Sequence, residues 1–398
     1  MGIVIWEDDP VVITAAKRTP IGSFQGALSG LSAPRLGSIA IAAALAVNGL
    51  RSADEVFMGN VLAAGLGQNP ARQAALGAGL GENVPATTVS KVCGSGMKAL
   101  ILGHDSIMAG SNARVVVGGM ESMSNAPYLL PKARRGLRLG HGEVKDHMFT
   151  DGLEDAYSGR LMGSYAEETA EAYQFSRGDQ DAFAITSLER AVAAQASGAF
   201  QNELVAIDEP AGKTRAVLDH DEQPTKADVS RIPHLKPAFR DDGTVTAANS
   251  SSISDGAAAL VLMRASEAER IGATPRAAIA GHAGHARQPG QFTTAPIGAI
   301  TALLEKTGWR ASEAGLYEIN EAFAVVAMAA IRDLALPIET VNVNGGACAL
   351  GHPIGASGAR IVVTLLHAMA GRGVRKGIAA LCIGGGEATA VALEMWPR

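Results

Sequence analysis

Residues 342–360 read N-V-N-G-G-A-C-A-L-G-H-P-I-G-A-S-G-A-R, and five of the fourteen residues in 345–358 are glycine. Such a density of glycine predicts backbone conformations that other residues avoid. The segment then continues into residues with a helical period of apolar positions. We therefore expect a rigid loop that leads into a helix, with His352 fixed directly before the helix begins.

The end of this segment has a counterpart near position 95. Residues 357–360 (S-G-A-R) match residues 95–98 (S-G-M-K) at an offset of 262, and each opens a helix-period segment. Before them, the polar turn and short strand that end at Asn60 resemble those that end at Asn320, at an offset of 260. After them, the strand residue Val117 matches Ile383 at an offset of 266. Slowly growing offsets indicate an internal duplication with small insertions.

The two copies differ by one large insertion. In the second copy a final strand at 388–393 follows the glycines directly, whereas its counterpart at 256–262 lies about 130 residues after Gly119. Residues 122–254 therefore form an insertion, which is rich in charge and holds an amphipathic helix at 180–197. Strands alternating with helices predict an α/β protein of two units with mixed five-stranded sheets packed against each other. The insertion would be a lid or a substrate-binding elaboration.

Composition excludes several classes of protein. The 398 residues carry a net charge of −5, which argues against nucleic acid as the main partner. The longest apolar run, residues 39–47, is far shorter than the roughly 20 residues of a membrane span. Three cysteines exclude a disulfide framework and are typical of a reducing compartment. Residues 1–10 contain three acidic residues and no basic one, unlike a targeting peptide. We expect a cytoplasmic protein.

Cys93 is the first candidate for chemistry. A β-branched strand is predicted to end at Cys93, and a G-S-G turn then leads into a helix. A thiol just before a helix N-terminus lies where the helix dipole favours the thiolate. The glycines also leave backbone N–H groups open to a developing oxyanion. The alternative is a buried structural cysteine, the commoner case; the strand–turn–helix context favours a nucleophile.

His352 and Cys382 are the next candidates. An imidazole fixed in a rigid loop suits a general base, and Cys382 ends the strand predicted at 377–383. A thiol near a strand or loop end in each repeat predicts one site at a pseudo-symmetric interface. No short C-x-x-C or H-x-x-x-H pair accompanies them, so we expect no metal. Cys348, among small residues, is interpreted as a packing residue.

Asn320 follows a predicted strand and stands where a helix is expected to begin. Asparagine is a good N-cap, so a purely structural role is one interpretation. The other is that its amide orients a water molecule or an oxyanion. The glycine-rich loops match neither G-x-G-x-x-G with its acidic partner nor G-x-x-x-x-G-K-[ST], so a nucleotide cofactor is not expected.

Taken together, these segments resemble the thiolase family, in particular its short-chain acetyl-CoA acetyltransferase branch. The motifs are V-C-G-S-G-M-K-A, G-G-M-E-S-M-S-N-A-P-Y, N-E-A-F-A, N-G-G-A-x-A-L-G-H-P-x-G-x-S-G-A-R and C-I-G-G-G, spread over residues 15–386. The resemblance implies duplicated halves in a layered α-β-α-β-α arrangement. It divides the chain into residues 1–122, completed by 254–274, an inserted loop domain at 123–253, and a second half at 275–398.

The resemblance also implies a role for each candidate. Cys93 would be the acylated nucleophile, and His352 would take its proton and later help bind the thioester oxygen. Cys382 would exchange a proton with C2 of the second acetyl-CoA. Asn320 would hold a water that forms one oxyanion hole with His352, and the backbone N–H groups of Cys93 and Gly384 would form the other.

The implied reaction is the reversible, ping-pong condensation of two acetyl-CoA to acetoacetyl-CoA and CoA, without any cofactor beyond these thioesters. A longer-chain 3-ketoacyl-CoA thiolase and a non-catalytic acyl-CoA-binding homologue are the alternatives; the second would lack the nucleophile or the base. The family is commonly a homotetramer, a dimer of dimers, and the basic residues 132–138 could lie at the tetramer contact or form a solvated loop.

The loop domain would bind coenzyme A. By resemblance, Met162 would limit acyl-chain length, and the residues along the pantetheine groove would be Leu153, Met162, Phe239, Ala247 and Ser251, with Ala322 and Phe323 near its end. Each could equally be a packing residue. The sequence departs from the short-chain pattern at Leu161, where His is usual, at Thr225, where Arg is frequent, and at Ser252, where Gly is usual.

Overall fold

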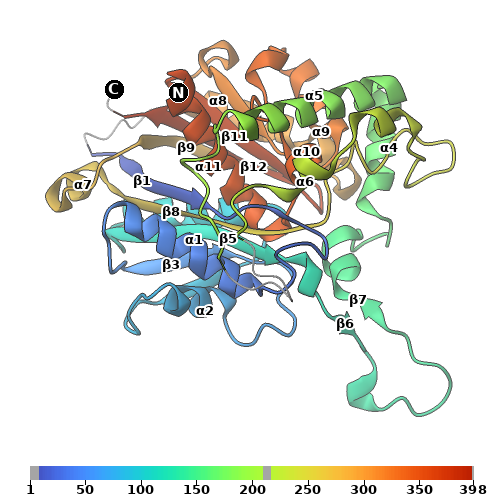
Figure 1. Ribbon diagram of the computed structural model, residues 1–398, viewed down its shortest axis with the longest axis horizontal. Helices are drawn as coiled ribbons and strands as arrows, with labels where there is room; N and C mark the ends of the chain where they lie inside the picture. Colours follow the sequence, from blue (N-terminus) through green and yellow to red (C-terminus); the bar gives the residue numbers. More distant parts are fainter. Residues whose placement is uncertain (1–8, 209–216, 397–398) are drawn as a thin grey trace.

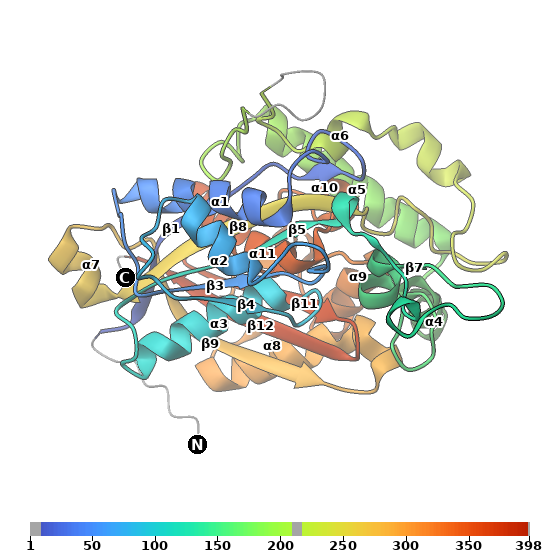
Figure 2. The ribbon, with the colours of Figure 1, turned by 90° about the horizontal axis from the view of Figure 1, so that it is seen from below.

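A computed structural model describes residues 9–208 and 217–396 of the chain (Figure 1). Most of the amino-terminal segment that bears on localisation, residues 1–8, lies outside this range. The described chain folds into two α/β halves with the insertion at one end (Figures 1 and 2). The fold class predicted from the sequence is confirmed, with two differences in detail. In the second half a single bridge stands where a fifth strand was expected, and a short pairing joins the two sheets.

The first half is a five-stranded mixed sheet in the order β4-β3-β5-β8-β1. Its strands are β1 (Val11–Arg18), β3 (Glu55–Gly59), β4 (Ala86–Val89), β5 (Arg114–Ser122) and β8 (Ser254–Arg264). β3 runs parallel to β4 and β5, and β8 runs antiparallel to β5 and β1. The short β2 (Gly22–Ser23) pairs with β8. The helices of this half are α1 (Ala33–Val47), α2 (Pro70–Gly77), α3 (Ser95–Met108) and α7 (Ala265–Ile271).

The second half repeats this pattern in the order β10-β11-β12-β9. Its strands are β9 (Ala277–Ala286), β10 (Leu316–Ile319), β11 (Lys376–Ile383) and β12 (Glu387–Met395). A single bridge between Tyr317 and Val341 stands where the fifth strand was expected. Two residue pairs between β1 and β9 also join the two sheets. The helices are α8 (Ala295–Thr307), α9 (Ala324–Asp333), α10 (Ala347–Leu350) and α11 (Ile354–Arg372).

Helices α3 and α11 form the central layer between the two halves. Both bury apolar side chains in one core that also includes the inner faces of β5, β8 and β11. Separate apolar clusters lie under α1 and α2 on one outer face and under α8 on the other. These clusters complete the five layers. Burial of so much apolar surface is the main force that holds the layers together.

The duplicated Ser-Gly pair is the place where the central helices touch. A Cβ on Gly96 would lie 2.8 Å from the backbone nitrogen of Ala359, and a Cβ on Gly358 would lie 2.5 Å from that of Met97. Only glycine permits an approach this close, which explains why both copies keep it. Among the described residues, α11 is long and apolar enough to cross a membrane, but 89% of its apolar window is buried in the protein.

The insertion leaves the first sheet at the end of β5 and returns at the start of β8. It contains β6 (Tyr128–Leu129), β7 (Lys145–Asp146), α4 (Met162–Tyr173), α5 (Arg177–Ala196) and α6 (Glu222–Lys226). The helix predicted at 180–197 is confirmed as α5; it starts three residues earlier because Ser176 and Asp179 form a capping box. Helices α4 and α5 pack near α9, while the loop between β6 and β7 projects from the body (Figure 1).

Candidate active site

Cys93 follows a tight turn rather than a strand. The sequence predicted a strand ending at Cys93, but β4 ends at Val89 and residues 90–92 turn the chain. Val92 has φ 46°, a left-handed conformation that a β-branched residue rarely adopts. The Ser95 hydroxyl braces the turn, since it accepts from Lys91 N at 2.9 Å and donates to Val92 O at 2.6 Å. The turn places Cys93 directly before Gly94, the N-cap of α3.

Cys93 lies on the wall of a largely apolar cavity of about 390 Å³, together with His352 and Gly384. The backbone N–H groups of Gly384 and of Cys93 itself favour the charged form of the Cys93 sulfur and so act to lower the pKa of its thiol. Cys93 comes from the first half, whereas His352 and Gly384 come from the loops before α11 and after β11 of the second half. The predicted meeting of the two repeats at one site is therefore present in the structure.

The protonation states of this pair differ from the sequence-based expectation. Burial raises the pKa of Cys93 to about 11, although the two backbone N–H groups act in the opposite direction. Burial, followed by the charge of Arg360, lowers the pKa of His352 to about 3. At neutral pH the pair is a thiol and a neutral imidazole. The raised pKa contradicts the expected thiolate for the free protein, because desolvation outweighs the backbone N–H groups that favour the charged form.

Ser357 fixes the tautomer of His352. Its hydroxyl donates to the carbonyl of Pro353 at 2.9 Å, so the same hydroxyl must accept from His352 Nδ1, which lies 2.5 Å away. The proton of the neutral imidazole therefore resides on Nδ1. Nε2 keeps its lone pair, and it has no hydrogen-bond partner within the described part of the chain. His352 is thus held ready to accept a proton at Nε2.

Cys382 lies near the carboxyl end of β11, behind the cavity wall. It is fully buried in an apolar cluster that includes the cavity-lining residues Ala322 and Phe323. Burial raises the pKa of its thiol well above the usual value, and the nearby Cys93 raises it further. Cys382 is therefore a neutral thiol at neutral pH.

Asn320 is not the cap of a helix. It directly follows Ile319, the last residue of β10, and α9 starts only at Ala324, with Phe323 in the cap position. Asn320 is 1% exposed, and over the residues that the structure describes neither atom of its amide has a hydrogen-bond partner. A buried amide with both atoms unpaired favours a bound water or ligand atom, in line with the second interpretation of Asn320. It does not itself line the cavity but precedes Ala322 by two residues.

All seven residues assigned to coenzyme A contacts line the same cavity. They are Leu153, Met162, Phe239, Ala247, Ser251, Ala322 and Phe323. Phe292 and Phe149 also line it and were missed, because isolated aromatic residues outside a motif carry no distinguishing signal. Leu161 lies on the wall too, so its departure from the family pattern makes the wall more apolar. Gly163 is required next to it, since a Cβ there would lie 2.2 Å from the Phe239 ring.

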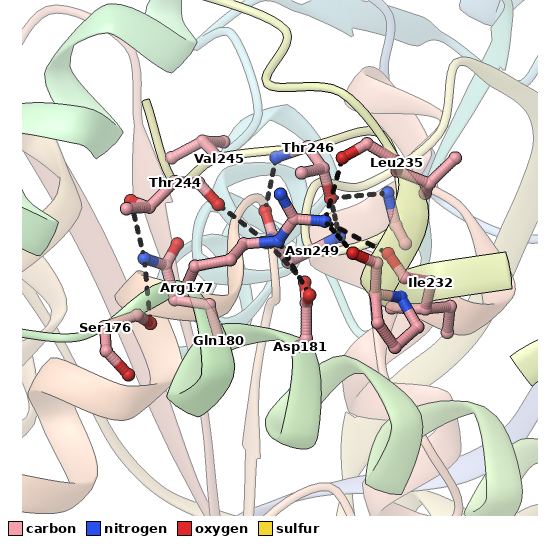
Figure 3. A network of polar contacts seen from close by, with 12 residues as sticks. Ser176, Arg177, Gln180, Asp181, Ile232, Leu235, Thr244, Val245, Thr246 and Asn249 are labelled. Atoms are coloured by element: carbon pink, nitrogen blue, oxygen red, sulfur yellow. Dashed lines mark hydrogen bonds and ion pairs between the residues drawn. The ribbon is translucent and has the colours of Figure 1, made fainter. Parts of the chain in front are cut away.

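A network of polar contacts ties α5 to the chain on either side of the cavity-lining residues Ala238, Phe239 and Ala247 (Figure 3). Asp181 accepts from Arg177 Nε at 2.6 Å and from Asn249 Nδ2 at 3.1 Å. Arg177 also donates to the carbonyl oxygens of Ile232 and Leu235. The Asn249 carbonyl accepts from Ala324 N at 2.8 Å. The network therefore joins α5, the 232–249 segment of the same insertion and the second half beside the cavity.

Two buried glutamates hold the loops that carry the candidate residues. Glu121 accepts from the backbone N–H groups of Val61, Leu62 and Gly355, and burial raises its pKa to about 7. Glu321 accepts from the side chains of Ser187 and Asn342 and from the backbone N–H of Cys348. Sequence reasoning assigned no role to either, although each stands inside one of the family motifs. Neither glutamate is among the residues that line the cavity. Each instead accepts hydrogen bonds that fix the neighbouring loops in place.

Cys348 lies away from Cys93. It is half-buried, its Sγ is 3.7 Å from the carbonyl oxygen of Glu321, and burial raises the pKa of its thiol well above the usual value. It lines a second cavity of about 320 Å³ that shares Ala247 and Ser252 with the first. These contacts agree with the interpretation of Cys348 as a packing residue.

A duplicated five-layer fold in which a half-buried cysteine from one half shares a cavity with a buried histidine from the other is the fold of an acyltransferase. The chain belongs to the thiolase family: the model for the thiolase N-terminal domain matches residues 11–266, and that for the C-terminal domain matches residues 273–395.

Curated relatives and solved structures agree with this assignment. Acetyl-CoA acetyltransferases from Schizosaccharomyces pombe and Pseudomonas aeruginosa are 49% and 50% identical to the chain, each over 96% of this chain and 98% of the relative. The crystal structure of Acat5 thiolase from Ascaris suum in complex with coenzyme A has a TM-score of 0.92 at 41% identity, and covers 97% of this chain and 100% of that one.

Proposed function

We propose that this protein is an acetyl-CoA C-acetyltransferase that condenses two acetyl-CoA to acetoacetyl-CoA and CoA, reversibly and through an acetyl-Cys93 intermediate. The observation that carries the proposal is one cavity whose wall is shared by Cys93, by Gly384 and by the His352 imidazole, whose Nε2 has no hydrogen-bond partner among the described residues. The names of the relatives support the acetyl-CoA substrate.

In the first half-reaction the Cys93 thiol attacks the thioester carbonyl while its proton passes to His352 Nε2. A new carbon–sulfur bond forms to Cys93, the bond to the CoA sulfur breaks, and His352 returns the proton to the departing CoA thiolate. The N–H groups of Cys93 and Gly384 stabilise the intermediate oxyanion; one such donor is typically worth about 3–4 kcal/mol. Because the thiol and the imidazole are both neutral at rest, proton transfer accompanies the attack.

In the second half-reaction a carbanion must form next to a thioester. Cys382 first gives its thiol proton to His352 Nε2, and the resulting thiolate removes a proton from C2 of the second acetyl-CoA. The carbon then attacks the acetyl group, the bond to the Cys93 sulfur breaks, and the Cys93 thiolate takes the proton back from His352. We assign the enolate oxygen to His352 and to a water held by Asn320, whose unpaired amide supports this role. In the cleavage direction the raised pKa of Cys382 means that its thiol keeps the proton until the carbanion takes it.

The two adjoining cavities fit the two ends of coenzyme A. The apolar cavity next to Cys93 suits the acyl group and the pantetheine, and the second cavity carries Lys226 and Arg231 on its wall. Their cationic groups suit phosphate oxygens. Thr225, where the family frequently has Arg, instead donates to the carbonyl of Glu222 in α6. We therefore place the nucleotide end of coenzyme A in the second cavity, near these two cations.

Mass spectrometry of the protein after mixing with acetyl-CoA tests the proposal. One acetyl group is expected on Cys93, and none in Cys93→Ala. Cys382→Ser is expected to acquire the acetyl group on Cys93 and to fail in condensation. An acetyl group on another residue would overturn the nucleophile assignment, and condensation at a normal rate by Cys382→Ser would overturn the acid/base assignment.

We also propose a homotetramer whose assembly uses the loop between β6 and β7. Leu139 in this loop is 98% exposed, Tyr128 is 70% exposed and Val144 is 60% exposed. Large exposed apolar side chains on this loop and on the adjoining strand β6 favour a protein–protein contact. Leu139→Asp should sediment as a smaller species than the unaltered protein and still acetylate Cys93. An unchanged sedimentation coefficient would overturn the proposal.

A further inference from the structure

A cluster of two histidines and one aspartate lies outside the cavities described above. His104 and Asp105 belong to α3 of the first half, and His282 belongs to β9 of the second half. One ligand atom from each of the three lies within 4.8 Å of the others. Asp105 Oδ1 is 3.1 Å from His104 Nδ1 and 2.9 Å from His282 Nε2. The two rings meet edge to face, with centroids 5.1 Å apart.

From this geometry we propose that His104, Asp105 and His282 bind a divalent transition-metal ion of the zinc type. Two imidazole nitrogens and one carboxylate oxygen are a donor set that such ions prefer. Tetrahedral bonds of about 2.1 Å separate the donor atoms by about 3.4 Å. The two separations from Asp105 Oδ1 need to open by only a few tenths of an ångström to reach that geometry, a change that side-chain torsions can supply.

An open groove adjoins the three ligands. The groove has a volume of about 350 Å³, and Asp105 and His282 lie on its wall beside Lys98 and His285. Three protein ligands with one open position are typical of zinc sites that keep a water or a small anion. The Asp105 side chain is half exposed, so an ion can reach the site directly from solvent.

The positive charge of Lys306 lowers the affinity that we expect of the three ligands for a metal ion. Its Nζ donates to the carbonyl of His282 at 3.1 Å, so a fixed positive charge lies close to the three ligands. This charge opposes a second cation and therefore weakens binding. Removal of the charge in Lys306→Met should tighten zinc binding, whereas a random surface association would be insensitive to it.

A bound ion would connect the two halves of the protein. Helix α3 begins beside Cys93, and β9 belongs to the second half, which supplies His352. An ion held by both stabilises the folded protein in proportion to its occupancy. The site was invisible in the sequence because His104 and His282 are 178 positions apart and form no short motif.

Isothermal titration of the metal-free protein with ZnCl₂, supported by the visible absorption of added Co²⁺, tests the proposal. One equivalent should bind, with the Co²⁺ spectrum of a tetrahedral site. His282→Gln and Asp105→Asn should each weaken binding at least tenfold. His220→Gln is the matched control, because His220 Nδ1 and Asp219 Oδ1 form an exposed pair at 2.9 Å that no third ligand among the described residues joins; it should bind as the unaltered protein does.

Cys93→Ala separates this site from the thiols. If the equivalent disappears in Cys93→Ala and persists in His282→Gln, the ion binds at the active-site thiols and the proposal is overturned. Absence of binding in the unaltered protein also overturns it. Neither result bears on the acetyltransferase proposal, which is tested by acetylation of Cys93.

Discussion

His352 Nδ1 lies 2.5 Å from Ser357 Oγ, and the Ser357 hydroxyl donates in turn to the carbonyl of Pro353 at 2.9 Å. This pair of bonds assigns the imidazole proton to Nδ1 and leaves Nε2 free to act as a base. Ser357 is fully buried in the first turn of α11, so no water competes for its hydroxyl. It is a positioning residue, because it acts on the reaction through His352.

Ser357→Ala should lower kcat about ten- to hundredfold and leave KM within about twofold. The change leaves a buried Nδ1–H without an acceptor, which costs about 1–3 kcal/mol and weakens the preference for the productive tautomer. Steady-state kinetics with acetoacetyl-CoA and CoA measure both constants. Ser106→Ala is the control, because the Ser106 hydroxyl makes a similar bond to a helix carbonyl without a histidine partner. Equal effects of the two substitutions would contradict the role of Ser357.

The rate of Cys93 acetylation should not change between pH 5 and pH 8. His352 acts as a base only when neutral, and its pKa is lowered to about 3, so it stays neutral over this range. Cys93 stays a thiol, since its pKa is raised to about 11. An imidazole of ordinary pKa near 6.5 would instead lose activity about tenfold per unit below that value. Quenched single-turnover acetylation, read by mass spectrometry, distinguishes the two; a decline centred near pH 6.5 would contradict the assignment.

Met162→Ala should shift the acyl preference toward longer chains. The Met162 sulfur lies beside Gly384, 3.5 Å from the position that a Cβ would take there, so the side chain fills space next to the proposed oxyanion donor. Removal of the Met162 side chain opens room for additional methylene groups of the substrate's acyl chain. Each methylene contributes about 1–3 kcal/mol to discrimination between substrates. The ratio of kcat/KM for 3-ketohexanoyl-CoA to that for acetoacetyl-CoA should rise at least tenfold.

The same measurement on the unaltered protein separates the two enzyme classes. A preference for acetoacetyl-CoA is expected of an acetyl-CoA acetyltransferase. Higher kcat/KM for substrates with six or more carbons would instead identify a longer-chain 3-ketoacyl-CoA thiolase.

Asp181→Asn should lower the free energy of unfolding and raise KM, with little change in the rate of Cys93 acetylation at saturating acetyl-CoA. Asp181 is 5% exposed and joins Arg177 to Asn249, so loss of its charge weakens a hydrogen bond worth about 1.5–3 kcal/mol. The wall segment would then be less well fixed. Denaturant unfolding and saturation kinetics measure the two effects.

Glu168→Gln is the control for this prediction. Glu168 pairs with Arg160 at 2.7 Å on the protein surface, where an ion pair is worth at most about 1 kcal/mol. A KM unchanged in Asp181→Asn would show that the network does not hold the cavity wall.

Much of the fold follows from local sequence pattern. The duplicated S-G-M-K and S-G-A-R segments predicted two equivalent helices, and the long interval after Gly119 predicted the insertion between β5 and β8. These inferences succeed because apolar periodicity and glycine placement are properties of short segments. The predicted strand into Cys93 failed, because the turn at Val92 depends on the Ser95 hydroxyl, which a β-branched composition does not reveal.

The candidate residues were also accessible from the sequence, but their chemical states were not. Motif context and the family resemblance are enough to single out Cys93, His352, Cys382 and Asn320. The protonation of Cys93 was expected wrongly, because the helix dipole can be inferred locally whereas desolvation depends on the whole surrounding core. The tautomer of His352 likewise depends on a bond to Ser357.

The sequence by itself determined the duplicated architecture, the family and the residue types available for catalysis, since these are written in segments of a few to twenty residues. Only the tertiary structure decided which groups share a cavity, that Cys93 and His352 rest as neutral partners, and that His104 and Asp105 meet His282 from the other half. Burial, hydrogen-bond partners and ligand geometry depend on residues that are far apart in the sequence. No local sequence pattern encodes how close such residues lie in space.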